Sequence, residues 1–140
     1  MADEGEMRRI LRAGWRGPGE LAWVEHARGG TEGNPDVFVP LGKGHGYLPL
    51  ELKWWEIEGG IVTFFARPAQ RRFHRLAYES FQRTAFLALL SDGKIVLLPG
   101  GSMPRPGLET MKLDFFWVLD DVRWLGNFLR DPNFWRGKAR

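Results

Sequence analysis

The chain has 140 residues, 44% of them apolar and 26% charged, so it is long enough to bury one core and too apolar to be disordered. It has no cysteine, which excludes disulfides, zinc–thiolate sites and thiol nucleophiles, and its formal net charge of +3 favours polyanionic partners only slightly. No apolar run approaches the roughly 20 residues that span a bilayer, and the acidic start lacks the apolar region of a secretory signal. We therefore expect no membrane contact and a cytoplasmic location, in the host cell if the chain is phage-encoded.

Hydrophobic periodicity in the first half of the chain predicts a helix followed by strands. Residues 4–13 favour a short helix, with Met7, Ile10 and Leu11 on one face. The glycine-rich segment 41–46 predicts a hairpin between two strands. Four segments have the composition of strands: residues 21–26, 36–40, 47–55 and 61–65.

The second half predicts a helix, a β-hairpin and a final helix. Pro68 suits the first turn of a helix. An apolar face then recurs at helical spacing, at Ala69, Phe73, Leu76, Ala77 and Ser80. Residues 84–90 and 94–98 favour strands joined by the turn 91–93, and residues 100–107 a Pro/Gly loop. Asp120 and Asp121 are candidate caps of a helix that ends near Arg130.

This order of elements predicts an α/β fold, with a mixed central β-sheet flanked by helices. We expect residues 1–140 to form a single domain, with a core over about 20–100 and a C-terminal extension over 101–140. The sequence leaves open whether that extension completes the core, forms a dimer face or contacts DNA.

The candidate chemistry lies in Asp36 and in the segment Glu51-Leu52-Lys53. Alternate side chains of a strand share a face, so Glu51 and Lys53 point the same way. If the predicted hairpin pairs their strand with the strand of Asp36, two carboxylates and an ammonium meet. Two nearby carboxylates repel unless a cation lies between them, and a hard divalent ion with oxygen ligands removes that repulsion.

These residues resemble the PD-(D/E)xK nuclease superfamily. Pro35-Asp36 matches the first half of that motif, and Glu51-Leu52-Lys53 on a predicted strand matches the second. The wider segments 33–37 and 50–53 resemble the VRR-NUC branch, which is similar to phage Holliday-junction resolvases. That branch carries a glutamine at the start of the next helix, where Gln70 stands within 67–74. The resemblance covers about residues 23–98.

The resemblance implies a restriction-endonuclease-like fold, Mg²⁺ or Mn²⁺ as cofactor, and hydrolysis of DNA phosphodiester bonds. Asp36, Glu51 and the Leu52 backbone carbonyl are then the expected metal ligands. Lys53 is expected to assist the attacking water, and Gln70 to support the site or the scissile phosphate. Branched DNA is the expected substrate, and a homodimer is plausible because related resolvases are often dimers. A nick, flap or DNA-end nuclease remains an alternative.

A further glutamate often completes such sites. Glu25, next to the strand of Asp36, and Glu6, on the first helix, are both candidates, and Glu20 is a weaker one. The sequence leaves the choice between them open.

A group of arginines near the second helix is a candidate DNA-binding surface, although a solvated basic face is the alternative. Its members are Arg67, Arg71, Arg72 and Arg75. His74 lies one turn from Gln70, and we expect it at the surface. The alternative to a nuclease is a nucleic-acid-binding or virion-assembly protein that keeps this fold without catalysis.

Overall fold

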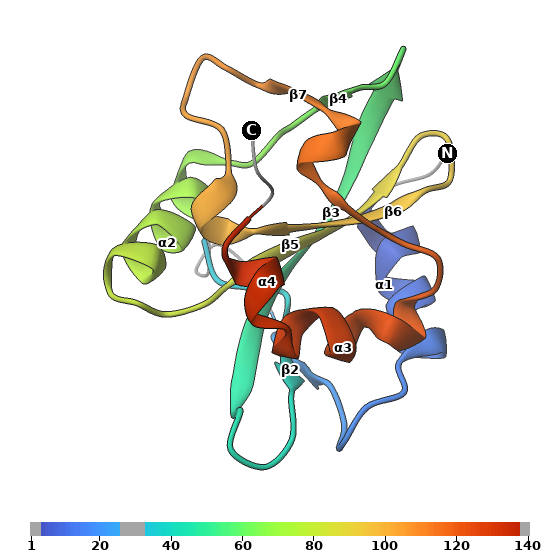
Figure 1. Cartoon of the computed structure of the whole chain (residues 1–140), viewed down its shortest axis with the longest axis vertical. Helices are drawn as coiled ribbons and strands as arrows, with labels where there is room; N and C mark the ends of the chain where they lie inside the picture. Colours follow the sequence, from blue (N-terminus) through green and yellow to red (C-terminus); the bar gives the residue numbers. More distant parts are fainter. Residues whose placement is uncertain (1–3, 26–32, 138–140) are drawn as a thin grey trace.

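A mixed β-sheet runs through the computed structural model, which describes residues 4–25 and 33–137 (Figure 1). Within those residues the strands pair in the order β1-β2-β3-β5-β6-β8, and β4 and β7 extend the far end of β3. The strands are β1 (Ala22–Trp23), β2 (Val37–Pro40), β3 (Tyr47–Glu58), β4 (Ile61–Thr63), β5 (Ala85–Leu90), β6 (Ile95–Pro99), β7 (Thr110–Lys112) and β8 (Trp117–Leu119). β3 and β5 are parallel and the other pairs are antiparallel, which confirms the predicted mixed sheet.

Helices flank this sheet, as predicted. They are α1 (Glu4–Gly14), α2 (Pro68–Glu79), α3 (Leu125–Arg130) and α4 (Pro132–Trp135), with single 3₁₀ turns at η1 (Gly100–Ser102), η2 (Leu113–Phe115) and η3 (Val122–Trp124). α1 and α2 lie on opposite sides of the central strands (Figure 1). Within the described ranges, no helix is both long and apolar enough to cross a membrane.

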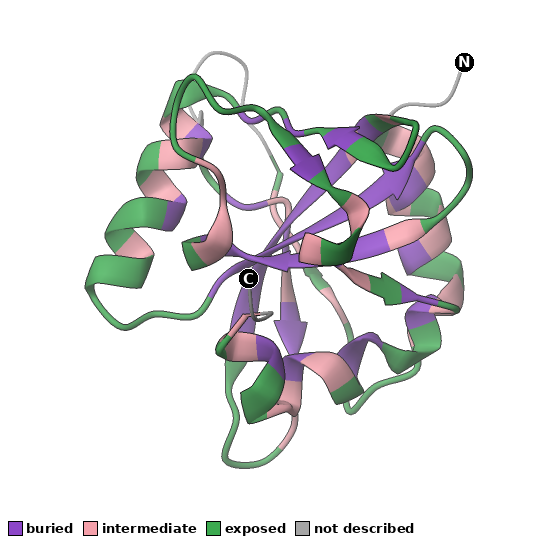
Figure 2. Cartoon of the chain, turned by 45° about the horizontal axis from the view of Figure 1, so that its top comes forward, coloured by how far each residue is buried: buried purple, intermediate pink, exposed green. Residues whose placement is uncertain are grey.

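Each face of the sheet covers its own apolar cluster, because side chains alternate along the strands. Leu50, Leu52 and Leu87 face the helices α1, α3 and α4. Trp55 and Phe86 face the other way. There they pack against Phe64, Met111 and Phe116. The central strands are buried along most of their length (Figure 2). By the same alternation, Glu51 and Lys53 share the face of Trp55.

The elements that the sequence did not predict are too short to show hydrophobic periodicity. β7, β8 and α4 each span three or four residues, which is too short for alternation or helical spacing to show. β3 is longer than expected, at 12 residues, and β1 is shorter, at two. The C-terminal segment completes the core: β8 pairs with β6, and Leu125, Leu129 and Phe134 are buried.

The predicted apolar face of α2 was wrong in part. Ala69, Phe73 and Ala77 are half-buried, but Leu76, expected inside, is 57% exposed. The buried residues of this helix are Gln70 and His74. The cause lies in the sheet, because α2 covers the region where the Glu51 and Lys53 side chains emerge. A helix over buried charges must turn polar groups towards them.

The packing of β5 gives a direct test of the fold. Leu87→Ala removes a fully buried side chain from the middle of the sheet, so we expect a loss of about 3 kcal/mol in the free energy of unfolding. Urea denaturation measures it, with Leu108→Ala at a half-exposed loop position as the control, expected to cost less than about 0.5 kcal/mol. Equal losses for the two variants would contradict the assignment of Leu87 to the core.

Candidate active site

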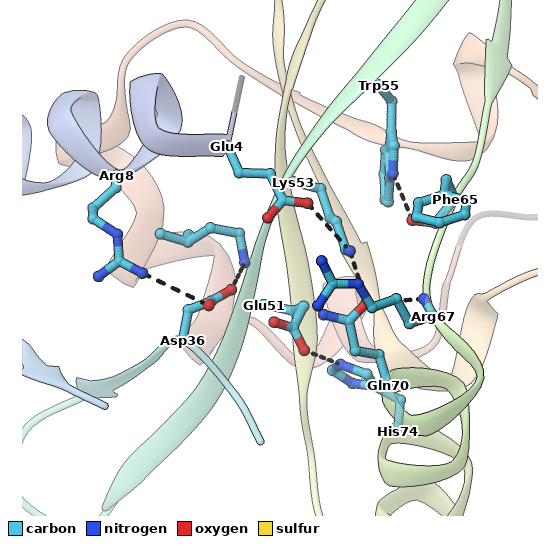
Figure 3. A network of polar contacts seen from close by, with 11 residues as sticks. Glu4, Arg8, Asp36, Glu51, Lys53, Trp55, Phe65, Arg67, Gln70 and His74 are labelled. Atoms are coloured by element: carbon cyan, nitrogen blue, oxygen red, sulfur yellow. Dashed lines mark hydrogen bonds and ion pairs between the residues drawn. The ribbon is translucent and has the colours of Figure 1, made fainter. Parts of the chain in front are cut away.

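Glu51 and Lys53 lie side by side on β3, and each is only 1% exposed (Figure 3). The structure therefore confirms the prediction that Glu51 and Lys53 share one face of the strand. Charged side chains are almost never buried to this extent without partners. The groups that contact Glu51 and Lys53 therefore indicate the chemistry of this site.

Asp36 joins Glu51 through the register of the β2–β3 hairpin. Val37 pairs with Leu50, so the residue that precedes β2 lies beside Glu51 and Leu52. The Leu52 backbone N–H donates to Asp36 Oδ2 at 2.8 Å, and the Arg8 guanidinium of α1 lies 3.7 Å from Asp36 Oδ1. The glycine-rich connection at 41–46 forms the expected turn, with Leu41 donating to the Gly46 carbonyl. The hairpin thus places the two carboxyl groups next to each other.

The Leu52 carbonyl points towards the Asp36 and Glu51 carboxyl groups. A residue's N–H and C=O project from the same side of an extended strand. The Leu52 N–H reaches Asp36, on the β2 side, whereas the Trp55 carbonyl accepts from Ser91, on the β5 side. Leu52 therefore turns its carbonyl to the β2 side, where Asp36 lies. The Leu52 carbonyl needs this orientation if it is to be the backbone metal ligand expected from the sequence.

Lys53 is held by two side chains from different helices. Its Nζ donates to Gln70 Oε1 at 2.7 Å and lies 3.3 Å from Glu4 Oε1 (Figure 3). Gln70 Oε1 also accepts the Arg67 backbone N–H at 3.0 Å, which caps the first turn of α2. A single amide oxygen thus fixes both the start of the helix and the ammonium group. Gln70 supports the site through Lys53.

Among the described groups, Glu51 has the most perturbed pKa. Burial raises its pKa from 4.5 to about 10, and the neighbouring Asp36 carboxyl raises it too, through a hydrogen bond and its charge, whereas Lys53 opposes the shift. No N–H group of the described residues donates to either Glu51 oxygen, so the contact with Asp36 is a hydrogen bond only when the two carboxyl groups share a proton. A buried carboxyl with unused lone pairs, beside a second carboxyl, is stable only if it binds a proton or a metal ion.

His74 lies behind Glu51 and is fully buried, so its expected place at the surface was wrong. Its Nδ1 lies 2.7 Å from Thr84 Oγ1, and its Nε2 lies 3.7 Å from Glu51 Oε1. Burial, with a further contribution from Lys53, lowers the pKa of His74 to about 4, so the ring is neutral at pH 7. Gly100 packs against both His74 and Thr84, where a Cβ would meet the Thr84 hydroxyl.

The donor set suits a hard cation better than a soft one. Within the described ranges, no cluster of three or more His, Cys, Asp or Glu side chains could hold a metal ion. An ion at this site would therefore rest on the Asp36 and Glu51 carboxylates, the Leu52 carbonyl and water. Mg²⁺ is commonly bound in this way, through one or two carboxylates with several waters retained. The unpartnered Glu51 oxygens fit such an ion.

The glutamate that joins the cluster from α1 is Glu4, which the sequence analysis did not select. Glu25 is exposed at the end of β1, and Glu6 lies on α1, but the carboxylate that contacts Lys53 is that of Glu4. A signal for it existed, because Glu4 precedes the buried Met7 by three positions and Leu11 by seven. That spacing puts Glu4 in line with the buried stripe of the helix. Arg8, which contacts Asp36, lies one turn further along α1 and was missed as well.

The predicted arginine surface divides into two kinds of residue. Arg67, which precedes α2, and Arg72 and Arg75 on that helix are exposed and open to a ligand. Arg71 is half-buried: it donates to the Pro104 carbonyl at 2.7 Å and lies over the Phe64 ring. Arg71 therefore ties α2 to the loop that follows η1.

Comparisons of the chain with protein-family models, curated proteins and solved structures found no match. Any functional conclusion therefore depends on the residues and geometry described above.

The Glu51 carboxyl makes stability depend on pH. The unfolded chain releases this proton near pH 4.5, but the folded chain retains it up to about pH 10, so folding loses stability as the pH rises between those values. Glu51→Gln has no proton to lose. Without divalent ions, we expect the variant to match the wild type near pH 5 and to exceed its free energy of unfolding by more than about 2 kcal/mol at pH 8.

Urea denaturation across this pH range measures the difference. The control is Glu56→Gln, which changes an exposed glutamate on the same strand and should leave the pH dependence as it is. Stability curves for Glu51→Gln and the wild type that stay parallel from pH 5 to pH 8 would contradict the raised pKa.

Proposed function

We propose that this protein is a metal-dependent nuclease that hydrolyses DNA phosphodiester bonds. The observation that carries the proposal is the buried Glu51 carboxyl beside Asp36 and Lys53, whose oxygens accept no hydrogen bond from an N–H group of the described residues. A fold gains nothing in stability from such a group, because burying an unpaired carboxylate costs free energy. Perturbed carboxyl groups of this kind concentrate at functional sites.

Asp36 and Glu51 are the proposed metal ligands, together with the Leu52 carbonyl. A bound Mg²⁺ or Mn²⁺ would polarise the phosphodiester and lower the pKa of a coordinated water. The Leu52 N–H fixes the Asp36 carboxylate on one side. His74 stands behind Glu51 on the other, in contact with Thr84. Glu51 is thereby held on β3, and Asp36 directly before β2, and rigid strands orient ligands better than loops do.

Lys53 is the proposed catalytic cation. Its ammonium is held by Gln70, so it can orient the attacking water and offset the negative charge that develops on the phosphate. Water adds to phosphorus, one P–O ester bond breaks, and the leaving oxygen takes up a proton, which yields a phosphate monoester and a free hydroxyl.

DNA is the proposed substrate because basic residues surround the site. Arg8 lies 3.7 Å from Asp36, and Arg67 begins α2 directly beside Gln70. Arg72 and Arg75 extend this positive surface along the exposed side of α2. Arginines pair with phosphate oxygens in a bidentate way and so position a nucleic-acid backbone. Branched DNA, a homodimer and a cytoplasmic location are proposed only from the resemblance and composition noted in the sequence.

A plasmid-nicking assay tests the proposal. In Mg²⁺ or Mn²⁺, we expect the wild type to convert supercoiled plasmid to nicked or linear DNA, and EDTA to abolish cleavage. Asp36→Ala removes a metal ligand and Lys53→Ala removes the cation, so each should lower the cleavage rate by about 100-fold or more. Gln70→Ala should lower it less, since Gln70 acts through Lys53.

Matched controls separate catalysis from general charge. Glu56→Ala removes an exposed carboxylate from the same strand, and Glu25→Gln changes the exposed glutamate at β1; neither should slow cleavage. Circular dichroism verifies that each variant is folded. If the wild type binds DNA but cuts no linear, nicked or branched substrate in either metal, the protein is a non-catalytic nucleic-acid-binding protein instead.

A further inference from the structure

A cavity of about 580 Å³ opens at the C-terminal end of α2, and none of the residues that the proposed chemistry uses lines it. Tyr78 and Phe81 line it from the end of the helix, and Trp135 and Arg136 from the end of α4. Its volume falls in the range of sites that bind small organic groups. Of the described residues that line it, two are arginines, Arg83 and Arg136, and none is acidic.

Phe81 is the unusual member of this cavity. It is 97% exposed, and its φ of 61° makes it the non-glycine residue with positive φ in the described chain. Gln82 donates to the Ala77 carbonyl and Phe81 to the Tyr78 carbonyl, which is the hydrogen-bond pattern of a Schellman motif with Phe81 at its left-handed position. Glycine is favoured there, because a side chain on left-handed backbone is strained.

The protein thus holds a large aromatic ring in water at a position where glycine would be more stable. Such strain persists mainly at functional sites. Beside the ring, the Arg83 guanidinium lies 5.2 Å from the centre of the Trp135 ring, which fixes a positive charge at the cavity wall. Exposed aromatic rings with adjacent arginines are how proteins bind unpaired nucleotides, since rings stack on bases and arginines contact phosphates.

The cavity is also close to the candidate active site. Thr84 lines its wall, and the Thr84 hydroxyl contacts His74, whose Nε2 faces Glu51. The buried side chains of His74 and Thr84 thus connect the wall of this cavity to the Glu51 carboxylate through the protein interior.

We propose that this cavity binds an unpaired nucleotide of a DNA strand, with its base stacked on Phe81 and its phosphate near Arg83 and Arg136. This inference rests on the proposed function, in that it names the substrate: DNA that carries a single-stranded segment. It extends that function by assigning a second binding site, outside the Asp36–Glu51–Lys53 cluster.

Fluorescence anisotropy in EDTA, where no cleavage occurs, tests the proposal. The ligands are a fluorescein-labelled thymidine oligomer of about 12 nucleotides and an abasic oligomer with the same backbone. We expect the wild type to bind the thymidine oligomer about tenfold more tightly, because only that oligomer has bases to stack. Phe81→Gly should bind both with the weaker affinity, while its thermal midpoint stays equal to or above that of the wild type.

Two further variants define the site. Arg136→Ala should reduce the slope of the logarithm of the binding constant against the logarithm of the salt concentration by about 0.7, as expected for one lost phosphate contact. Leu76→Ala changes an exposed apolar residue of α2 that does not line the cavity, and this variant should bind like the wild type.

The proposal is overturned if the wild type binds both oligomers equally, or if Phe81→Gly keeps the preference for bases. Its failure is distinct from failure of the nuclease proposal. If Mg²⁺-dependent cleavage occurs without a base preference, the cavity assignment alone is wrong. If the base preference depends on Phe81 but no DNA is cut, the cavity assignment stands and the nuclease proposal fails.

Discussion

Burial of the Glu51 carboxyl next to Asp36 is the constraint to which the rest of this structure responds. In water, a glutamate prefers to be ionised at neutral pH, but here desolvation and a neighbouring carboxyl raise its pKa to about 10. The hairpin register causes this proximity, because pairing of Val37 with Leu50 places Asp36 opposite Glu51. A protein retains such an arrangement at a cost in stability. A divalent ion between the two carboxylates would offset that cost, because its attraction to both carboxylates compensates for their lost hydration and their mutual repulsion.

The surrounding side chains follow from the same constraint. Lys53 balances the acidic pair from the next position on the strand face and is itself anchored by Gln70. α2 turns Gln70 and His74 inward and leaves Leu76 in solvent, so the helix is rotated from the orientation that apolar periodicity alone would give. The polar demands of a buried site here outweigh the burial of one leucine, which contributes only about 2 kcal/mol. Phe86, in the apolar cluster on the same sheet face, packs against His74 with 4.1 Å between the ring centres.

Local patterns in the sequence were sufficient to predict the central strands of the sheet and the proximity of Asp36, Glu51 and Lys53. Alternation placed Glu51 and Lys53 on one face, and the glycines of residues 41–46 indicated the hairpin that brings Asp36 to them. The orientation of α2, the burial of His74 and the contact of Glu4 with Lys53 could not be predicted in this way. Each depends on which helix face meets the sheet, and the apolar residues of α2 gave a misleading answer. The cavity beside Phe81 is formed by segments about 50 residues apart in the chain, α2 and α4, whose contact no local pattern encodes.

Anomalous diffraction from a crystal soaked in Mn²⁺ tests the central claim most directly. We predict an anomalous peak between the carboxylates of Asp36 and Glu51, within coordination distance of the Leu52 carbonyl, and no peak in a crystal of Glu51→Gln soaked in the same way. A wild-type crystal that shows no peak there at millimolar Mn²⁺, or a peak that persists in Glu51→Gln, would contradict the claim that this buried acidic pair exists to hold a metal ion.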